Sequence, residues 1–194
     1  MGSTEIDDGG LWARSLEGEG DAFGALFDRH RDRVFRHAYR LCGNRHDADD
    51  ILATSFLELW RRRRKVRIVE GSVLPWLLVT TTNVARNSGR TEFRYRRLLS
   101  SLPRENAVAD PASYPYVDGQ VDGEAARALE TLTALDLRLV SLVVFEEYPI
   151  AAAAAILNLT PAAAKSRMHR ARQRMKKAIV GPQWPTPALE GDRS

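Results

Sequence analysis

The chain has 194 residues, of which 44% are hydrophobic and 28% charged, which is ordinary for a globular protein with room for one large domain or two small ones. No apolar run approaches the roughly 20 residues that a membrane-spanning helix needs. Segment 1–10 is polar and acidic, so we expect no membrane association, no secretory signal and a cytoplasmic location. The single cysteine, Cys42, excludes an intramolecular disulfide and a cysteine-rich zinc site, and we expect no metal or cofactor.

Basic residues are segregated along the chain, although the net charge is only +4. They form an unbroken run at 61–65 that Arg67 extends, a cluster between Arg86 and Arg97, and seven Lys or Arg without any Asp or Glu across 160–180. Acidic residues collect instead in three segments: 1–8, 47–50 and 110–130. A polyanion-binding surface requires such segregation, although any single cluster is also consistent with a solvated helix face.

The first predicted module covers residues 20–98. Apolar residues recur at three- and four-residue spacing from Ala22 to Leu41, which predicts an amphipathic helix that Gly43 ends. Asn44 is placed to cap a second helix, whose acidic first turn suits the positive end of the helix dipole. Pro75 can open a third helix, so we expect a compact three-helix bundle.

Three segments lack a helical pattern. Residues 1–19 are expected to form a flexible N-terminus, and residues 181–194 a proline-containing tail. Residues 99–123 contain several prolines, glycines and aspartates without periodicity, which predicts a flexible linker. A linker of this length argues for two modules rather than one compact domain.

The second predicted module covers residues 124–180 and contains four helices. Leucines at helical spacing give the first, and Asp136 is expected to cap the second. A short alanine-rich helix runs from Ile150 to Leu157, and Thr160 caps the last helix, which begins with a proline. The sequence therefore predicts an all-α fold of two small helical modules joined by the linker.

Two helices joined by a short turn, the second of them basic, are typical of a helix-turn-helix DNA-binding unit. The last helix carries small residues at its front and arginines after them, an order that suits entry into a major groove, where Arg170 could read guanine. An alanine-rich helix beside a basic one is also a pattern of simple packing plus solvation. The predicted DNA-facing set is Thr160, Ala162, Ala163, Lys165, Ser166, Arg167, His169, Arg170, Gln173 and Arg174.

The first module carries a different set of side chains. A basic loop with the candidate residues Lys65, Arg67 and Ser72 leads into a helix whose indole, hydroxyl, amide and guanidinium groups suit stacking on unpaired bases and reading their edges. That helix contributes Trp76, Thr80, Asn83, Asn87, Arg90 and Arg94. Trp76 has a second interpretation, because a tryptophan at helical spacing is more often part of a core than a stacking platform.

Both halves of the chain resemble one known family, the extracytoplasmic-function (ECF, group 4) sigma factors of bacterial RNA polymerase. The resemblance to sigma region 2 rests on Asp21-Ala22-Phe23, Asp47-Ala48-Asp49-Asp50-Ile51, Phe56-Leu57, Trp60 and Pro75-Trp76-Leu77-Leu78 followed by Asn83. The resemblance to region 4 rests on 128–135 and on Lys165-Ser166-Arg167-Met168-His169-Arg170-Ala171-Arg172. The resemblance covers about residues 20–97 and 124–178.

The resemblance implies a bacterial transcription-initiation factor that binds core RNA polymerase and directs promoter recognition and DNA melting. The first module would bind the clamp helices of the largest polymerase subunit through Asp47, Asp49, Asp50, Ile51 and Phe56. The loop from Lys65 to Ser72, with the helix after it, would recognise and open the −10 element as single-stranded DNA. The second module would read the −35 element as duplex, near the polymerase flap region. An inhibitory anti-sigma protein is a further candidate partner.

The chain departs from the family pattern in places that bear on affinity and promoter choice. Ala53-Thr54 replace Gln-Glu, Thr80-Thr81-Thr82 replace Ile-Ala-Arg, and Ala151 to Ala155 replace acidic residues. The alternative function is a stand-alone helix-turn-helix regulator with a helical N-terminal sensor module. An enzyme is not expected, because no glycine-rich phosphate loop or His-Glu-x-x-His helix is present and the histidines are isolated.

Overall fold

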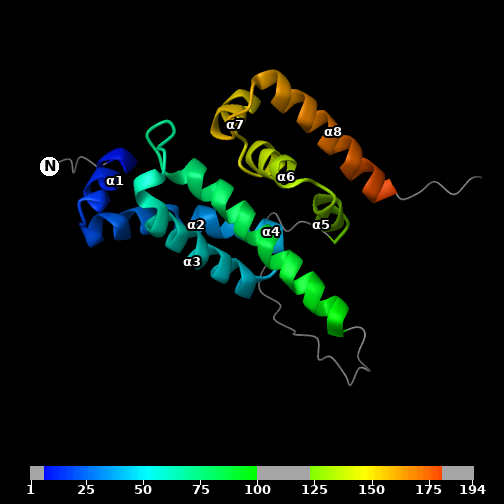
Figure 1. The fold of residues 1–194 in the computed structure, drawn as a ribbon, viewed down its shortest axis with the longest axis horizontal. Helices are drawn as coiled ribbons and strands as arrows, with labels where there is room; N and C mark the ends of the chain where they lie inside the picture. The colour runs from blue at the N-terminus through cyan, green and yellow to red at the C-terminus, as the bar shows by residue number, and fades with distance from the viewer. Residues whose placement is uncertain (1–6, 100–122, 181–194) are drawn as a thin grey trace, which may run out of the picture.

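The computed structural model describes residues 7–99 and 123–180, with side chains at 7–89 and 124–179. Within these ranges the secondary structure is helical apart from one isolated antiparallel bridge between Val69 and Ser72. None of the described helices combines the length and the apolar character needed to cross a bilayer. Figure 1 shows the helices, which are α1 (Asp8–Leu16), α2 (Gly20–Cys42), α3 (Arg45–Arg62), the 3-10 turn η1 (Arg63–Lys65), α4 (Leu74–Leu99), α5 (Gly123–Glu130), α6 (Ala134–Val140), the π-helical turn η2 (Ser141–Phe145), α7 (Ile150–Ile156) and α8 (Pro161–Val180).

The first module packs α2, α3 and α4 around leucine-rich stripes. Gly43 ends α2 in the left-handed conformation at φ 76°, and the Asn44 side chain accepts a hydrogen bond from the Asp47 amide at 2.8 Å. Both confirm the expected helix boundaries. Phe23, Phe27 and Phe56 meet edge to face between α2 and α3, with ring centroids 4.8 to 6.4 Å apart.

A helix stands where a flexible N-terminus was expected. In α1, the Asp7 side chain caps the helix by accepting a hydrogen bond from the Gly10 amide at 2.8 Å. Leu11 and Trp12 are only 5% and 3% exposed and join the core of the first module. The expectation for 1–19 is therefore wrong for the helical part, and residues 1–6 lie outside the described range. Two glycines and few apolar residues hid the helical period.

The second module consists of α5, α6 with its continuation η2, α7 and α8. Thr133, rather than Asp136 as predicted, caps α6, because its hydroxyl accepts a hydrogen bond from the Asp136 amide at 3.2 Å. Asn158 turns the chain between α7 and α8 at φ 54°, and Thr160 Oγ1 accepts a hydrogen bond from the Ala163 amide at 3.2 Å. The predicted turn and cap of the last helix are therefore confirmed.

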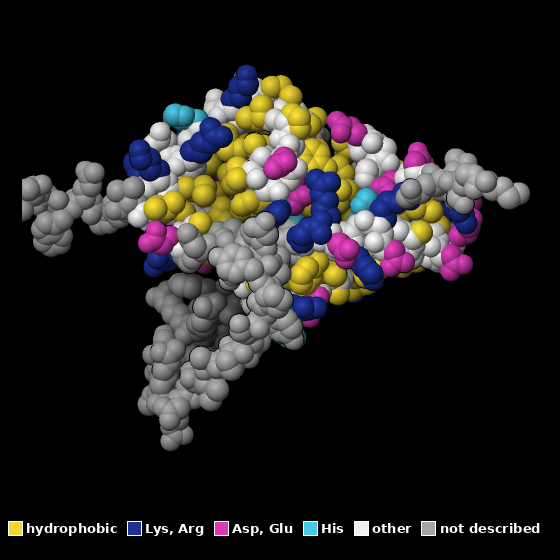
Figure 2. Space-filling view, turned by 180° about the vertical axis from the view of Figure 1, so that it is seen from behind, with side chains coloured by type: hydrophobic (Ala, Val, Ile, Leu, Met, Phe, Trp, Pro, Cys, Tyr) yellow, Lys and Arg dark blue, Asp and Glu magenta, His cyan; other side chains and the backbone are white. Residues whose placement is uncertain are grey.

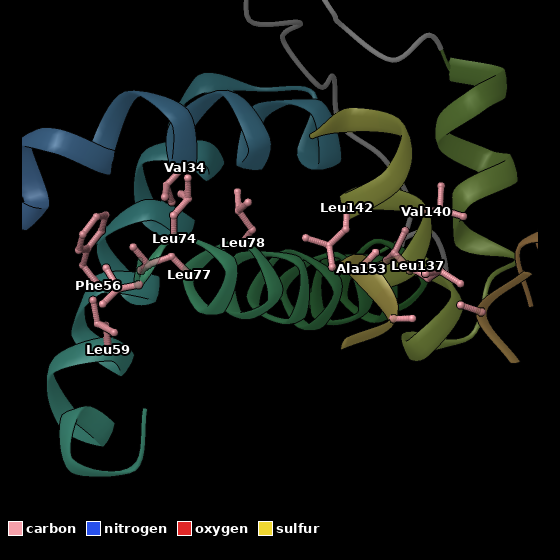
Figure 3. Packing of buried hydrophobic residues seen from close by; sticks show 14 of the residues in the cluster. Val34, Phe56, Leu59, Leu74, Leu77, Leu78, Leu137, Val140, Leu142 and Ala153 are labelled. Atoms are coloured by element: carbon pink, nitrogen blue, oxygen red, sulfur yellow. The ribbon is translucent and has the colours of Figure 1, made fainter. Parts of the chain in front are cut away.

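The two modules pack against each other. One continuous hydrophobic core runs through both, and Figure 3 shows its residues in a row from Phe56 and Leu59 through Leu78 to Leu142 and Val140. In Figure 1, α4 lies beneath α6 at this junction. The predicted all-helical, two-module fold is confirmed, with a fourth helix in the first module. Most of the predicted linker 99–123 and the whole tail 181–194 lie outside the described residues.

Candidate nucleic-acid interface

The second helix of the helix-turn-helix, α8, has one buried and one open face. Ala164, Met168 and Ala171 are at most 3% exposed and pack against the core. The opposite face leaves most of the predicted DNA-facing side chains open to solvent, while Ala163 is half-buried: exposed are Thr160, Ala162, Lys165, Ser166, His169, Arg170 and Gln173. Small residues at the front of the helix permit close approach to a groove, and Arg170 follows them.

Arg167 and Arg174 are placed differently from the prediction. Both guanidinium groups turn to the carboxylate of Asp136 on α6, with Arg167 Nη1 donating to Oδ1 at 3.0 Å and Arg174 Nη2 donating to Oδ2. Asp136 is 2% exposed. A buried carboxylate needs such partners, so these two arginines hold α8 on the module instead of projecting freely as bare DNA-reading groups.

The Asp136 carboxylate is ionised at neutral pH. Burial raises its pKa, but the hydrogen bonds from Thr133 and Arg167, together with the charges of both arginines, outweigh burial and hold the pKa below its ordinary value. Thr133 Oγ1 donates to Oδ2 at 2.7 Å. The carboxylate therefore fixes the start of α6 and the middle of α8 to each other.

Charge is distributed unevenly over the surface. Figure 2 shows Lys, Arg and a His along the edge formed by α8, whereas acidic side chains gather at the opposite end of the molecule. The α8 sequence contains no acidic residue. A duplex presents one phosphate charge per roughly 1.7 Å of axis, so a helix edge with this composition suits contact with its backbone.

The basic loop of the first module ends in a tight hairpin. Glu70 and Gly71 both have positive φ, 52° and 74°, the conformation of a two-residue type I′ turn. Val69 and Ser72 exchange both backbone hydrogen bonds, at 3.1 and 3.0 Å. Lys65 and Arg67, both exposed, precede this hairpin on the outside of the module.

The predicted base-contacting residues of α4 are only partly on the surface. Trp76 is half-buried and packs against the core, which favours the packing interpretation, and Thr80 is half-buried as well. Asn83 Oδ1 accepts a hydrogen bond from Arg138 Nε of the second module at 2.6 Å, so its amide is engaged at the junction. Asn87 is exposed, and the side chains of Arg90 and Arg94 lie outside the described set.

Two of the five predicted polymerase contacts require correction. Ile51 and Phe56 are 2% and 4% exposed, so they support α3 from inside and do not reach its surface. Asp49 and Asp50 are exposed and Asp47 is half-buried. Leu57 is a large apolar side chain of α3 that is 47% exposed; it falls off the buried stripe and could have been found from its phase.

A polar cluster at the junction had no signal in the sequence. Glu146, at the end of η2, is 8% exposed and receives three side chains of α2. Arg33 Nε donates to its Oε2 at 2.8 Å, His37 Nδ1 lies 2.9 Å from Oε1, and Arg40 Nη1 donates to the Phe145 carbonyl at 2.7 Å while lying 3.5 Å from Oε1. Burial raises the pKa of Glu146, but the hydrogen bonds and charges of His37 and Arg33 outweigh it and leave the pKa lowered.

Two helical modules, one with an exposed, acid-free helix-turn-helix and one with a basic hairpin loop, define a DNA-binding transcription protein. Residues 26–97 match Sigma-70 region 2, and residues 122–175 match Sigma-70, region 4. The chain therefore belongs to the sigma-70 family, and it is of the ECF type. The region 2 match identifies the first module as a sigma domain rather than a sensor, and this is not a family of enzymes.

Named relatives support the ECF type. The chain is 31% identical over 156 residues to the ECF RNA polymerase sigma factor SigE of Mycolicibacterium smegmatis, covering 78% of this chain and 59% of that protein. It is 28% identical to the RNA polymerase sigma factor CarQ of Myxococcus xanthus, covering 86% of this chain and 94% of CarQ.

Solved structures share the fold. CnrH, in complex with the cytosolic domain of CnrY, matches with a TM-score of 0.57 at 22% identity, over 89% of this chain and 97% of CnrH. The sigma factor RpoE of Bartonella quintana, in complex with the anti-sigma factor NepR, matches with a TM-score of 0.51 at 20% identity, over 83% of this chain and 98% of RpoE.

Proposed function

We propose that this chain joins core RNA polymerase as its promoter-specificity subunit and directs promoter recognition and DNA melting. The observation that carries the proposal is the exposed face of α8, which presents Lys165, Ser166, His169, Arg170 and Gln173 without a neighbouring acid on that helix. A region 2 module and a region 4 module occur in the order that such a factor needs.

The two modules divide the recognition of one promoter. The open face of α8 reads the −35 element as duplex through its major groove, with Arg170 contacting base edges and Lys165, Arg172 and Lys176 contacting phosphates. Lys65, Arg67 and the hairpin before α4 capture unpaired bases of the −10 element, which compensates the few kcal/mol that unpairing costs. Each reader alone is weak, and tethering both to polymerase raises their effective concentration at the promoter.

The contact between the two modules involves one of the residues proposed to bind the −10 element. Asn83, predicted to contact the −10 strand, is held by Arg138 of the second module while the modules are joined. Parting of the modules on polymerase releases this amide for DNA. The proposed polymerase contacts of the first module are three of the exposed side chains of α3, namely Asp49, Asp50 and Leu57.

An inhibitory anti-sigma protein is proposed as a further partner by analogy of fold, because the similar RpoE of Bartonella quintana is in complex with one. Pull-down of purified core polymerase, with and without a candidate inhibitor, tests both partners.

The DNA readout is tested by a pair of substitutions on α8. Arg170→Ala should abolish the preference of the holoenzyme for its own −35 sequence over a scrambled one, since it removes a base contact worth about 1–3 kcal/mol of discrimination. Lys176→Ala should weaken binding to both sequences equally, since a phosphate contact carries no sequence information. An equal loss on both sequences for both variants would contradict the assignment of α8.

A further inference from the structure

The carboxylate of Asp8, in the first turn of α1, joins three elements of the first module. Its Oδ2 accepts hydrogen bonds from the Ser72 hydroxyl and, at 3.3 Å, from the Val73 amide, and lies 2.6 Å from His30 Nε2. Its Oδ1 accepts a hydrogen bond from Arg29 Nη1 at 2.9 Å. Asp8 is 6% exposed, so the N-terminal helix, α2 and the hairpin end meet at one buried charge.

This contact fixes the basic loop at its C-terminal end. Ser72 closes the hairpin through its backbone bonds to Val69, and its Oγ accepts a hydrogen bond from the Leu74 amide at 3.1 Å, at the start of α4. At the other end, Arg63 stacks on Trp60 at 4.2 Å from the ring centroid. The loop that carries Lys65 and Arg67 is thus held between two anchors, of which Asp8 supplies the buried one.

The hydrogen bonds and ion pairs of Asp8 fix the position of the hairpin end more than they hold α1 on the module. Leu11 and Trp12 already bury the apolar face of α1 in the core. Burial raises the pKa of Asp8, but hydrogen bonds from Ser72 and Arg29 and the charge of His30 outweigh burial and leave the pKa lowered, so the carboxylate is ionised at neutral pH. A fully partnered buried charge fixes the relative position of the groups that surround it.

We propose that Asp8 is a positioning residue for promoter opening, which holds the hairpin end where the loop before α4 captures unpaired −10 bases. The role rests on the proposed function and deepens it. Asp8 lies outside the region 2 match at 26–97, so it is a contribution of the N-terminal helix to a loop that the matched region contains. Asp8 acts through Ser72 and does not itself touch DNA.

The test compares Asp8→Asn with Asp7→Asn in holoenzyme. Both remove one negative charge from the same end of α1, but Asp7 is exposed and only caps the helix, a task that Asn performs equally well. The rate of open-complex formation is measured as a function of holoenzyme concentration, with permanganate detection of unpaired thymines. The concentration dependence reports closed-complex binding, and the limiting rate reports melting.

We expect Asp8→Asn to lower the limiting melting rate by about tenfold, since misplacing a positioned group by about 1 Å costs up to about 100-fold. Closed-complex binding should stay unchanged, and Asp7→Asn should match the wild type. A variant that merely lowers the folded fraction changes the apparent holoenzyme concentration and leaves the limiting rate intact. Hydrogen exchange at the Val73 amide should become faster in Asp8→Asn only.

Ser72→Ala keeps the pairs of Asp8 with Arg29 and His30, so it provides a second test of the same contact if Asp8→Asn does not fold. Its melting rate should fall too, and the double variant should be no slower than the slower single variant, because both act through one contact. An unchanged melting rate in Asp8→Asn, despite faster exchange at Val73, would overturn the positioning role alone. A wild-type holoenzyme that starts no transcript would overturn the proposed function, and this role with it.

Discussion

The Glu146 cluster predicts that one isosteric change loosens the junction between the modules. Glu146→Gln keeps the shape of the side chain but removes its charge. Its amide NH₂ then points either at Arg33, on the Oε2 side, or at His37 and Arg40, on the Oε1 side, and a guanidinium group is itself a donor. Glu147→Gln is the matched control, because Glu147 is exposed, lies one residue further and makes the same change in charge.

The magnitude follows from the exposure of each partner. The His37 and Glu146 side chains are 0% and 3% exposed, so their bond is a buried charge-assisted one, worth about 1.5–3 kcal/mol. Arg33 and Arg40 are 43% and 27% exposed, which leaves each of their pairs with Glu146 worth only about 0.2–1 kcal/mol. Together the loss is about 2–5 kcal/mol, which shifts the equilibrium between joined and parted modules by about 30- to 4,000-fold.

Small-angle X-ray scattering of the full chain measures this shift as a change in radius of gyration. Glu146→Gln should be larger than the wild type, and Glu147→Gln should be indistinguishable from it. Far-ultraviolet circular dichroism should show that both variants keep their helices. A scattering curve of Glu146→Gln that superimposes on that of the wild type would refute the claim that this cluster holds the modules together.

Three further outcomes follow from the charged contacts. Asp136→Asn should lower the free energy of unfolding by about 1–3 kcal/mol in urea titrations, since Arg167 and Arg174 lose a buried charged partner, and a loss no greater than that of an exposed Glu130→Gln would contradict it. The melting temperature should be nearly constant down to about pH 5 and fall below it. Asp136 and Glu146 have lowered pKa values in the folded protein, so their contribution to the free energy of unfolding is complete above the ordinary carboxyl pKa. That contribution disappears as the pH drops through the lowered pKa values. A melting temperature that rises on acidification would contradict the ion pairs. The logarithm of the binding constant of the holoenzyme for duplex DNA should fall linearly with the logarithm of the salt concentration, with a slope of about −0.9 per neutralised phosphate. Lys176→Ala should reduce the magnitude of that slope by about one. An unchanged slope would show that Lys176 does not contact a phosphate.

Local chemistry made much of the fold predictable. Gly43, Asn44 and Thr160 mark helix boundaries by their own backbone and side-chain preferences, and they do so in the structure. The open face of α8 followed from the helical period alone, because Ala164, Met168 and Ala171 define its buried stripe. Ile51 lies three residues after the buried Ala48, so the same helical period puts it on the core stripe of α3, which is incompatible with the surface contact that the family resemblance implied.

Contacts between distant segments could not be predicted from the sequence. Glu146 lies more than 100 residues from Arg33 and from His37 in the sequence, and nothing in their local patterns shows that they meet. Arg167 and Arg174 appeared to be free cations because their partner, Asp136, looked like a helix cap. The helix α1 was missed because a short helix depends on tertiary packing, here of Leu11 and Trp12, more than on its own propensity.

Run-off transcription with purified core RNA polymerase on a randomised promoter library tests the central claim most directly. We predict that adding the protein starts transcripts from a subset of templates, and that this subset shares two short sequence blocks, one upstream and one at the melted region. The upstream block should lose its conservation with Arg170→Ala while the other remains. Core polymerase that starts no additional transcripts with the protein present, or starts them without any shared upstream block, would contradict the account.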